Sequence, residues 1–142
     1  MLKITTLALA LSFATLAPVA ALACGEEKAQ VTQVSPKEGV ELQKKGATFV
    51  DANGKETRAK YGVIPGAILL TSYTEFNADK ELPAKKDSKL VFYCANTKCG
   101  ASFEAANKAM AAGYTDVAVL PDGIKGWKDA GLPTATPKAN NS

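Results

Sequence analysis

Residues 90–102 read LVFYCANTKCGAS and contain the clearest structural signal in the chain. The run 90–93 is continuous and apolar, as is typical of a central parallel strand that is buried on both faces. Cys94 ends this run, and a short loop over 95–101 leads to a helix that we expect to begin at Ser102. This order of strand, cysteine, loop and helix puts Cys94 at the carboxyl end of a strand and beside a helix N-terminus.

That position favours a reactive thiol at Cys94. Backbone N–H groups of the loop and the positive end of the helix can converge on an anion there, and Lys98 adds a full positive charge nearby in the sequence. Since the chain has no histidine, these groups are the available means of lowering the pKa of the thiol and forming a thiolate. The alternative interpretation is that Cys94 is a small core residue that ends the strand.

Strands and helices alternate on both sides of this stretch. The expected strands are 32–34, 47–51, 68–70, 90–93 and 117–120, and the expected helices are 36–45, 71–77, 102–112 and 124–130. A turn and a polar loop are expected over 53–60. The alternation predicts an α/β domain of three layers, with a central, mostly parallel sheet flanked by helices. Ligands bind beyond the carboxyl ends of the strands in such sheets, which again points to Cys94.

The first 23 residues have the features of a secretory signal peptide. Lys3 supplies the positive start, residues 7–16 are almost wholly apolar, and residues 21–23 place small side chains at the cleavage positions. We therefore predict export to a periplasmic location. A membrane anchor is the less favoured alternative, because the apolar run is marginal for a span of ~20 residues.

Short segments flank the predicted domain. Cys24 directly follows the predicted cleavage point, and a small residue followed by cysteine also resembles the lipobox of bacterial lipoproteins. Cleavage alone and lipidation of Cys24, the one expected link to a membrane, therefore both remain open. Residues 24–31 form a spacer, residues 32–133 form one domain, and residues 134–142 form a polar tail.

Composition narrows the functions that this domain can have. The chain of 142 residues contains 17 Lys and Arg, 14 Asp and Glu, three cysteines and no histidine. Nearly balanced, scattered charge argues against binding to nucleic acid. The lack of histidine excludes His-ligated zinc, imidazole-bound haem and a Cys-His catalytic pair. Two thiols alone make a poor zinc site, so neither a metal nor another cofactor is expected.

Several ordered motifs in residues 32–133 resemble those of the rhodanese-like domains. In chain order they are Asp51 after a strand, Tyr61-Gly62-Val63-Ile64-Pro65-Gly66-Ala67, Phe92-Tyr93-Cys94, Ala112-Gly113-Tyr114-Thr115-Asp116-Val117, and Gly123-Ile124-Lys125-Gly126-Trp127 with Ala130-Gly131-Leu132-Pro133. The resemblance implies a sulfurtransferase-type site in which Cys94 takes sulfane sulfur from a small donor such as thiosulfate. Cys94 would hold it as a persulfide and pass it to a nucleophilic acceptor. The implied substrate-binding residues are Ala95, Asn96, Thr97, Lys98, Cys99, Gly100 and Asp51.

The loop departs from the family pattern. It is two residues longer than usual, Ala101 stands where the family has arginine, and Val63 replaces the usual histidine. Arg58 is the only arginine and is far from the loop in sequence, so bidentate recognition of an oxyanion by a loop arginine is not available. Lys98 can act only as a point charge. The missing guanidinium also disfavours the related phosphatase and arsenate-reductase reactions.

The extra loop residues include Cys99, five positions after Cys94. A loop of this size can bring two Cα atoms within the ~4.4–6.8 Å that a disulfide needs, so Cys99 could resolve a persulfide or sulfenic acid on Cys94. In the alternative, Cys99 only packs under the loop. Two functions therefore remain. We favour sulfane sulfur transfer through Cys94 over a non-catalytic binding or redox-sensing module that uses a Cys94–Cys99 dithiol or disulfide.

Overall fold

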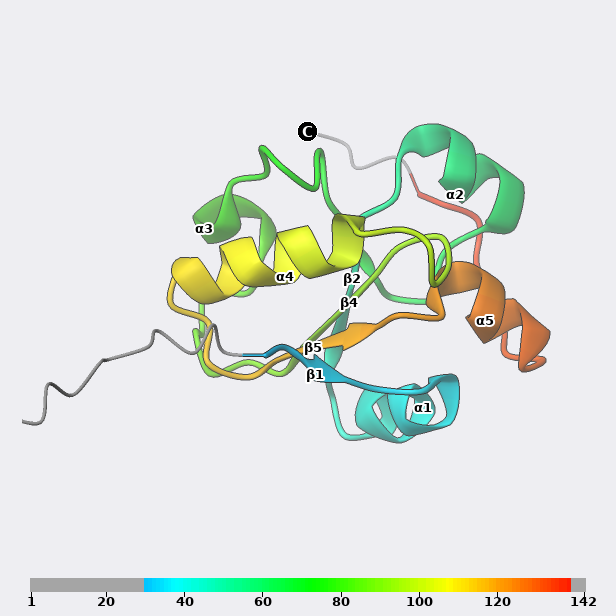
Figure 1. Cartoon of the computed structure of the whole chain (residues 1–142), viewed down its shortest axis with the longest axis horizontal. Coiled ribbons are helices and arrows are strands. Elements are labelled where there is room, and N and C mark those ends of the chain that lie inside the picture. The colour runs from blue at the N-terminus through cyan, green and yellow to red at the C-terminus, as the bar shows by residue number, and fades with distance from the viewer. Residues whose placement is uncertain (1–29, 139–142) are drawn as a thin grey trace, which may run out of the picture.

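One sheet of five parallel strands forms the centre of the protein (Figure 1). The computed structural model describes residues 30–138, and the predicted signal peptide, Cys24 and most of the spacer lie outside the described residues. The strand order is β1-β5-β4-β2-β3. The strands are β1 (Thr32–Gln33), β2 (Thr48–Asp51), β3 (Ile68–Leu69), β4 (Leu90–Tyr93) and β5 (Val117–Leu120). All five lie within one residue of the predicted strands, and the predicted fold class is confirmed.

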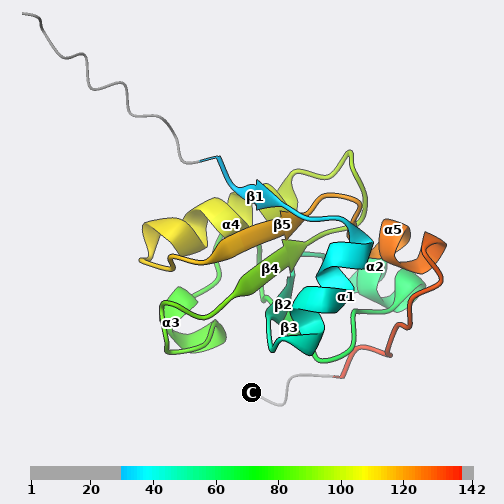
Figure 2. The same cartoon turned by 90° about the horizontal axis from the view of Figure 1, so that it is seen from below.

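Helices cover both faces of this sheet and complete three layers (Figure 2). They are α1 (Pro36–Lys44), α2 (Lys55–Tyr61), α3 (Ala78–Glu81), α4 (Ala101–Ala111) and α5 (Gly123–Asp129). The first core cluster joins one face of the sheet to α3 and α4, and the second joins the other face to α1, α2 and α5. Within residues 30–138, none of the helices is long and apolar enough to cross a membrane.

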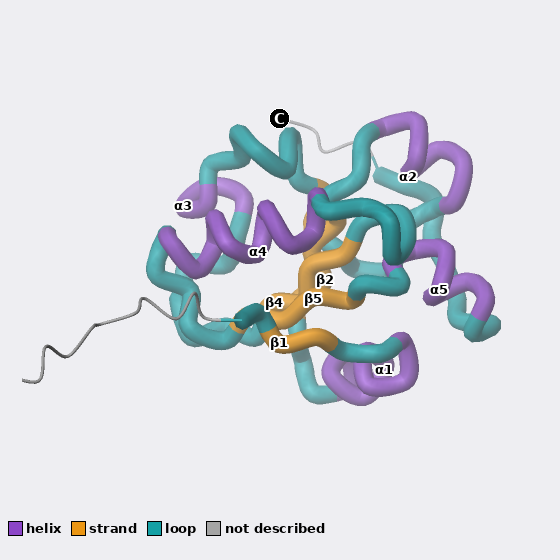
Figure 3. The backbone as a smooth tube through the Cα atoms, viewed as in Figure 1, coloured by secondary structure: helices purple, strands orange, loops and turns teal. Residues whose placement is uncertain are grey.

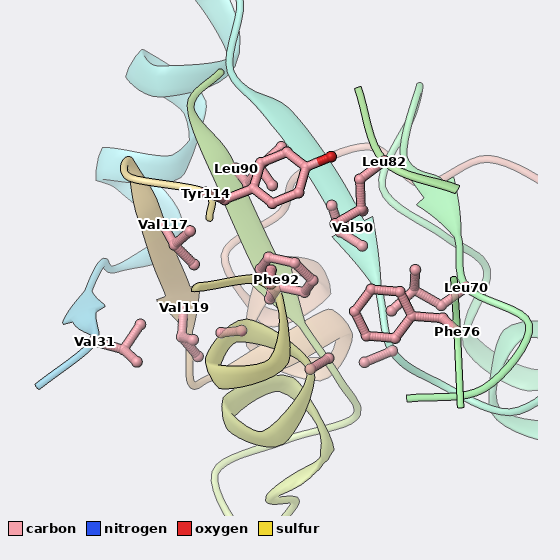
Figure 4. Close-up of a cluster of buried hydrophobic side chains, with 14 of the residues drawn as sticks. Val31, Val50, Leu70, Phe76, Leu82, Leu90, Phe92, Tyr114, Val117 and Val119 are labelled. Carbon is pink, nitrogen blue, oxygen red and sulfur yellow. The ribbon is translucent and has the colours of Figure 1, made fainter. Parts of the chain in front are cut away.

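Side chains of the central strand alternate between these two clusters. Leu90 and Phe92 point into the cluster that contains α4, as Figure 4 shows, whereas Val91 and Tyr93 point into the other. Cys94 continues the first series and belongs to the α4 cluster. Because successive strand residues face opposite sides of a sheet, the strand register alone directs the Cys94 side chain toward the start of α4.

The expected loop over 53–60 is wrong, since residues 55–61 form α2. Gly54 precedes the helix without a side-chain capping bond, so the usual capping signal is missing. The helix is held instead by Arg58, which is buried and hydrogen-bonded to the ends of two strands. Tertiary contact therefore overrides a weak local preference at this point.

The brief helix expected over 71–77 is also wrong. The Oγ atom of Ser72 accepts hydrogen bonds from two following backbone N–H groups, and this stabilises a turn. The short helix begins later, where the Asn77 side chain accepts from the N–H groups of Asp79 and Lys80 at 3.1 and 3.2 Å. The capping residue decides where this helix starts.

Packed structure continues beyond Pro133. Ala135 and Val63 exchange two backbone hydrogen bonds of 2.9 and 2.8 Å and form an antiparallel bridge. The beginning of the polar tail is therefore paired with the segment that precedes β3.

Candidate functional site

The loop between β4 and α4 is anchored by the start of α5. The N–H of Ile124 donates to the carbonyl of Cys94 at 2.9 Å, and the N–H of Lys125 donates to the carbonyl of Ala95 at 3.1 Å. Figure 3 shows the loop curling beside this helix end. Two N–H groups at a helix N-terminus have no partner within their own helix, and here they hold the beginning of the loop.

Gly123 makes this anchoring possible. Its φ is +62°, and a Cβ atom there would lie 2.5 Å from the carbonyl oxygen of Cys94 and 2.6 Å from the carbonyl carbon of Ala95. Only glycine combines that backbone conformation with so close an approach. The Gly123-Ile124 pair of the family motif therefore has a direct structural link to the candidate thiol.

Asn96 organises the turn of the loop. Its carbonyl accepts from the N–H of Cys99 at 3.0 Å, and its side-chain oxygen accepts from the N–H of Lys98 at 2.9 Å. Thr97, Lys98 and Gly100 are exposed. Within residues 30–138 no hydrogen bond or ion pair engages the Lys98 ammonium group.

Oxygen atoms, more than amide hydrogens, surround the sulfur of Cys94. Its Sγ atom donates to the carbonyl of Cys99 at 3.1 Å, lies 3.3 Å from the Oγ of Ser102, and reaches the carbonyl of Asn96 at 4.0 Å. The residue is 0% exposed. Burial, followed by the hydrogen bond to Cys99, raises the pKa of the Cys94 thiol. The sequence predicted that backbone N–H groups would surround this sulfur and lower the pKa of the thiol. That prediction is wrong, because the loop turns carbonyl groups toward the sulfur.

Cys99 has the opposite environment. It is partly exposed. Burial acts to raise the pKa of the Cys99 thiol, but the neighbouring Cys94 side chain and the N–H groups of Ala95 and Ala101 outweigh it and lower the pKa. The surroundings of Cys99 therefore favour its thiolate, whereas those of Cys94 favour the neutral thiol. Both cysteines are free thiols in the structure.

The N-terminus of α4 is shared between the two sulfurs. The N–H of Ala101 favours negative charge on Cys99, and the N–H of Ser102 favours it on Cys94. The sequence predicted that this helix N-terminus would act on Cys94. Ser102, which is fully buried, was missed as a site residue in the sequence, and its place at the first turn after the loop is the signal that indicates it.

Asp51 lies on the other face of the sheet from Cys94. Asp51 is two residues after Phe49 in β2, so the two side chains face the same side of the sheet. Phe49 packs with Tyr93 in the second core cluster. The Oδ1 atom of Asp51 accepts from the N–H of Asn53 at 2.7 Å and from Nε of Arg58 at 3.3 Å. The structure therefore does not bring Asp51 to the two thiols, and its observed partners are parts of the scaffold.

The Nε and Nη2 atoms of Arg58 are engaged in that scaffold. Its Nη2 atom donates to the carbonyls of Asp51 at 3.0 Å and Leu70 at 2.9 Å, in addition to the ion pair with the Asp51 carboxylate. The Tyr93 side chain extends this buried network, and burial and the adjacent Asp51 carboxylate raise the pKa of its hydroxyl group. The only arginine of the chain thus joins the ends of β2 and β3 rather than the cysteine loop.

Two other features bear on ligand binding. Within the described part of the chain, no three His, Cys, Asp or Glu side chains are grouped so that they could hold a metal ion. A hollow of about 280 Å³ lies between α2 and the tail, lined by residues 58–62, Lys128 and residues 134–137. It includes neither cysteine, so the chemistry that the two thiols can perform takes place at the surface loop.

Comparison with known proteins identifies the family. The model of the Rhodanese-like domain family matches residues 35–130. A protein of unknown function from Rhodopseudomonas palustris CGA009, described as a possible tyrosine phosphatase, is 30% identical with a TM-score of 0.61, over 74% of this chain and 85% of that chain. A search of curated proteins finds no match.

Two further solved structures share the fold. The rhodanese-like domain of the Alr3790 protein from Anabaena sp. is 22% identical with a TM-score of 0.62, over 80% of this chain and 85% of that chain. The polysulfide-sulfur transferase homodimer from Wolinella succinogenes is 17% identical with a TM-score of 0.64, over 81% of this chain and 85% of that chain. The family match covers the sheet, the cysteine loop and α5, and the chain belongs to the rhodanese-like domain family.

Proposed function

We propose that this protein is a sulfurtransferase that carries sulfane sulfur as a persulfide on Cys94. One observation carries the proposal: the Cys94 sulfur, at the end of the central strand, lies 3.3 Å from the Ser102 hydroxyl in the first turn of α4. A helix N-terminus stabilises an anion placed there. The outer sulfur of a persulfide is such an anion, and the chain's family membership supports the same chemistry.

The proposed reaction needs a small donor and a nucleophilic acceptor. Thiosulfate is the first donor to test. Polysulfide is the second, because one protein of the same fold is a polysulfide-sulfur transferase. No additional cofactor is required, since the sulfur atom moves between sulfur nucleophiles by exchange.

Mass measurement tests the proposal directly. Reduced protein is incubated with thiosulfate or polysulfide, and its intact mass is recorded before and after a cyanide chase. We expect the gain of one sulfur atom, which cyanide removes. In a Cys24→Ser background, the Cys94→Ser/Cys99→Ser double variant should gain none. A wild-type protein that takes no sulfur from either donor would refute the proposal.

A dithiol redox module is the second candidate function. The specific observation in its favour is that the Cys94 thiol donates to the backbone carbonyl of Cys99 at 3.1 Å, which brings two residues with free thiols together in one loop. An azodicarboxamide oxidant would take two hydrogens and leave a Cys94–Cys99 disulfide. A protein that forms this disulfide but never takes sulfur from a donor would favour the module over the transferase.

Phosphatase activity is not favoured, although one relative is described as a possible tyrosine phosphatase. A transferring phosphoryl group needs preorganised positive charge or hydrogen-bond donors. The guanidinium of Arg58 is bound to Asp51 and to two carbonyl groups. We expect no hydrolysis of p-nitrophenyl phosphate above that of the double cysteine variant.

We also propose that the chain is exported and acts on sulfur compounds in the periplasm. The support is the sequence of residues 1–23. The N-terminal mass of the protein purified from a producing bacterium tests this: a start at Cys24 indicates cleavage, and an added diacylglycerol indicates the lipoprotein. Retention of Met1 would contradict export by either route.

A further inference from the structure

A sulfur donor must reach the atom that attacks it, and Cys94 is enclosed. The residue is 0% exposed, and its Sγ atom faces the carbonyl of Cys99 and the hydroxyl of Ser102. A thiosulfate ion cannot contact this sulfur while the loop keeps its observed conformation.

Cys99 lies on the accessible side of the same loop. It is partly exposed, and both of its neighbours, Lys98 and Gly100, are exposed. The Lys98 ammonium group is free to contact an anionic donor. The neighbouring Cys94 side chain and the N–H groups of Ala95 and Ala101 also lower the pKa of the Cys99 thiol. This arrangement favours the thiolate form, which is the nucleophilic form of a cysteine.

We infer that Cys99 attacks the sulfur donor first and then hands the sulfur to Cys94. This relay rests on the proposed sulfurtransferase function and assigns the entry point of the sulfur. It also gives a role to the two additional loop residues, since they bring a second thiol to the N-terminus of α4.

Both steps of the relay are balanced. The Cys99 thiolate attacks the outer sulfur of thiosulfate, a sulfur–sulfur bond forms on Cys99, and sulfite leaves with the electron pair of the broken bond. Cys94 then attacks the outer sulfur of the Cys99 persulfide, and the Cys99 sulfur is the leaving group. The Cys99 thiolate that is released in this step takes up the proton that Cys94 loses. No oxidant or reductant is consumed.

The location of the sulfur can be followed in time. The full chain with Cys24→Ser, so that only two thiols remain, is mixed with thiosulfate and quenched with iodoacetamide at intervals. Trypsin cleaves after Lys98 and separates a peptide 90–98 with Cys94 from a peptide 99–108 with Cys99. We expect the added sulfur on peptide 99–108 first and on peptide 90–98 later.

Two variants sharpen the test. Cys94→Ser should trap the sulfur on Cys99, and Cys99→Ser should slow the loading of Cys94 by at least about tenfold, as judged from the enclosure of that sulfur. Circular dichroism establishes that each variant is folded. If one variant is unfolded, the order in which the two peptides gain sulfur in the protein with both cysteines tests the relay by itself.

The possible failures are distinct. Sulfur that appears on peptide 90–98 first, or a Cys99→Ser variant that loads Cys94 at the rate of the parent, would overturn the relay and leave the transferase proposal intact. Absence of sulfur on both peptides would overturn the transferase proposal, and the relay with it.

Discussion

The neighbouring strands β2 and β4 both end in a buried polar side chain, but the two ends have different surroundings. Asp51 at the end of β2 is 0% exposed and is bound by Arg58 and a backbone N–H group. Cys94 at the end of β4 is equally buried, and its sulfur faces a second thiol that is partly open to solvent. The end of β2 is closed by an ion pair, whereas the end of β4 adjoins a thiol that is partly exposed to solvent.

The difference shows that the carboxyl edge of a parallel sheet does not by itself make a site. Asp51 and Tyr93 are register partners, and their side chains lie on the face of α1, α2 and α5. Cys94, one residue later, turns to the face of α4. A side chain at this edge becomes reactive only on the face where a helix begins and a loop admits solvent.

Removal of Arg58 should have the largest effect and should act on stability. In Arg58→Leu the buried Asp51 carboxylate and two carbonyl groups lose their donor, at a cost of about 3–5 kcal/mol in the free energy of unfolding. Urea unfolding at neutral pH measures it. The exposed pair of Lys44 and Glu41 is the control, and Lys44→Ala should change stability by less than about 1 kcal/mol. Equal effects in the two variants would contradict the contrast between the strand ends.

Gly123→Ala should affect the β4 end through the backbone. The new Cβ would clash with Cys94 and Ala95, so we expect a loss of about 1–3 kcal/mol and slower sulfur loading. Gly113→Ala is the matched control, because Gly113 also has a positive φ of +95° but has nothing within 4 Å of the added atom. The Gly113→Ala variant should have a strained backbone and yet take up sulfur at the normal rate. Slow loading in both variants would show that strain alone, without displacement of the loop, explains the result.

The pH dependence of alkylation should distinguish the two thiols. The pKa of Cys99 is lowered, so its reaction with iodoacetamide should reach half its maximal rate below the value of about 8.5 for a free cysteine. Cys94→Ala removes a side chain that favours the charged form of Cys99. The midpoint should then rise toward the value of a free cysteine. An unchanged or lower midpoint would exclude support of the Cys99 thiolate by Cys94.

The smallest effect is expected from the exposed charge on the loop. Lys98→Ala should slow loading from thiosulfate by about two- to threefold at low salt, and the difference should vanish near 1 M salt because exposed charges are screened. Lys37→Ala, on the exposed surface of α1, should have no effect at either salt concentration. A Lys98 effect that persists at high salt would indicate direct contact with the bound donor.

Local pattern predicted the strands because each is a short apolar run between turn residues. The strand at 90–93 and the strand at 117–120 were predicted with their observed limits. The helices α2 and α3 were not, since α2 depends on the buried Arg58 and α3 on a cap at Asn77. Contacts that cross from one element to another are not present in a local window of sequence.

The sequence by itself determined the parallel three-layer fold and the place of Cys94 at the end of the central strand, because both follow from apolar runs and chain order. Only the tertiary structure decided how hydrogen bonds are divided in the loop. It turned two carbonyls toward Cys94, gave the Ala95 and Ala101 N–H groups to Cys99, and left Asp51 on the opposite face. The physical reason is that the charge state of a thiol depends on donors and burial from three separate segments, and these meet only when the chain has folded.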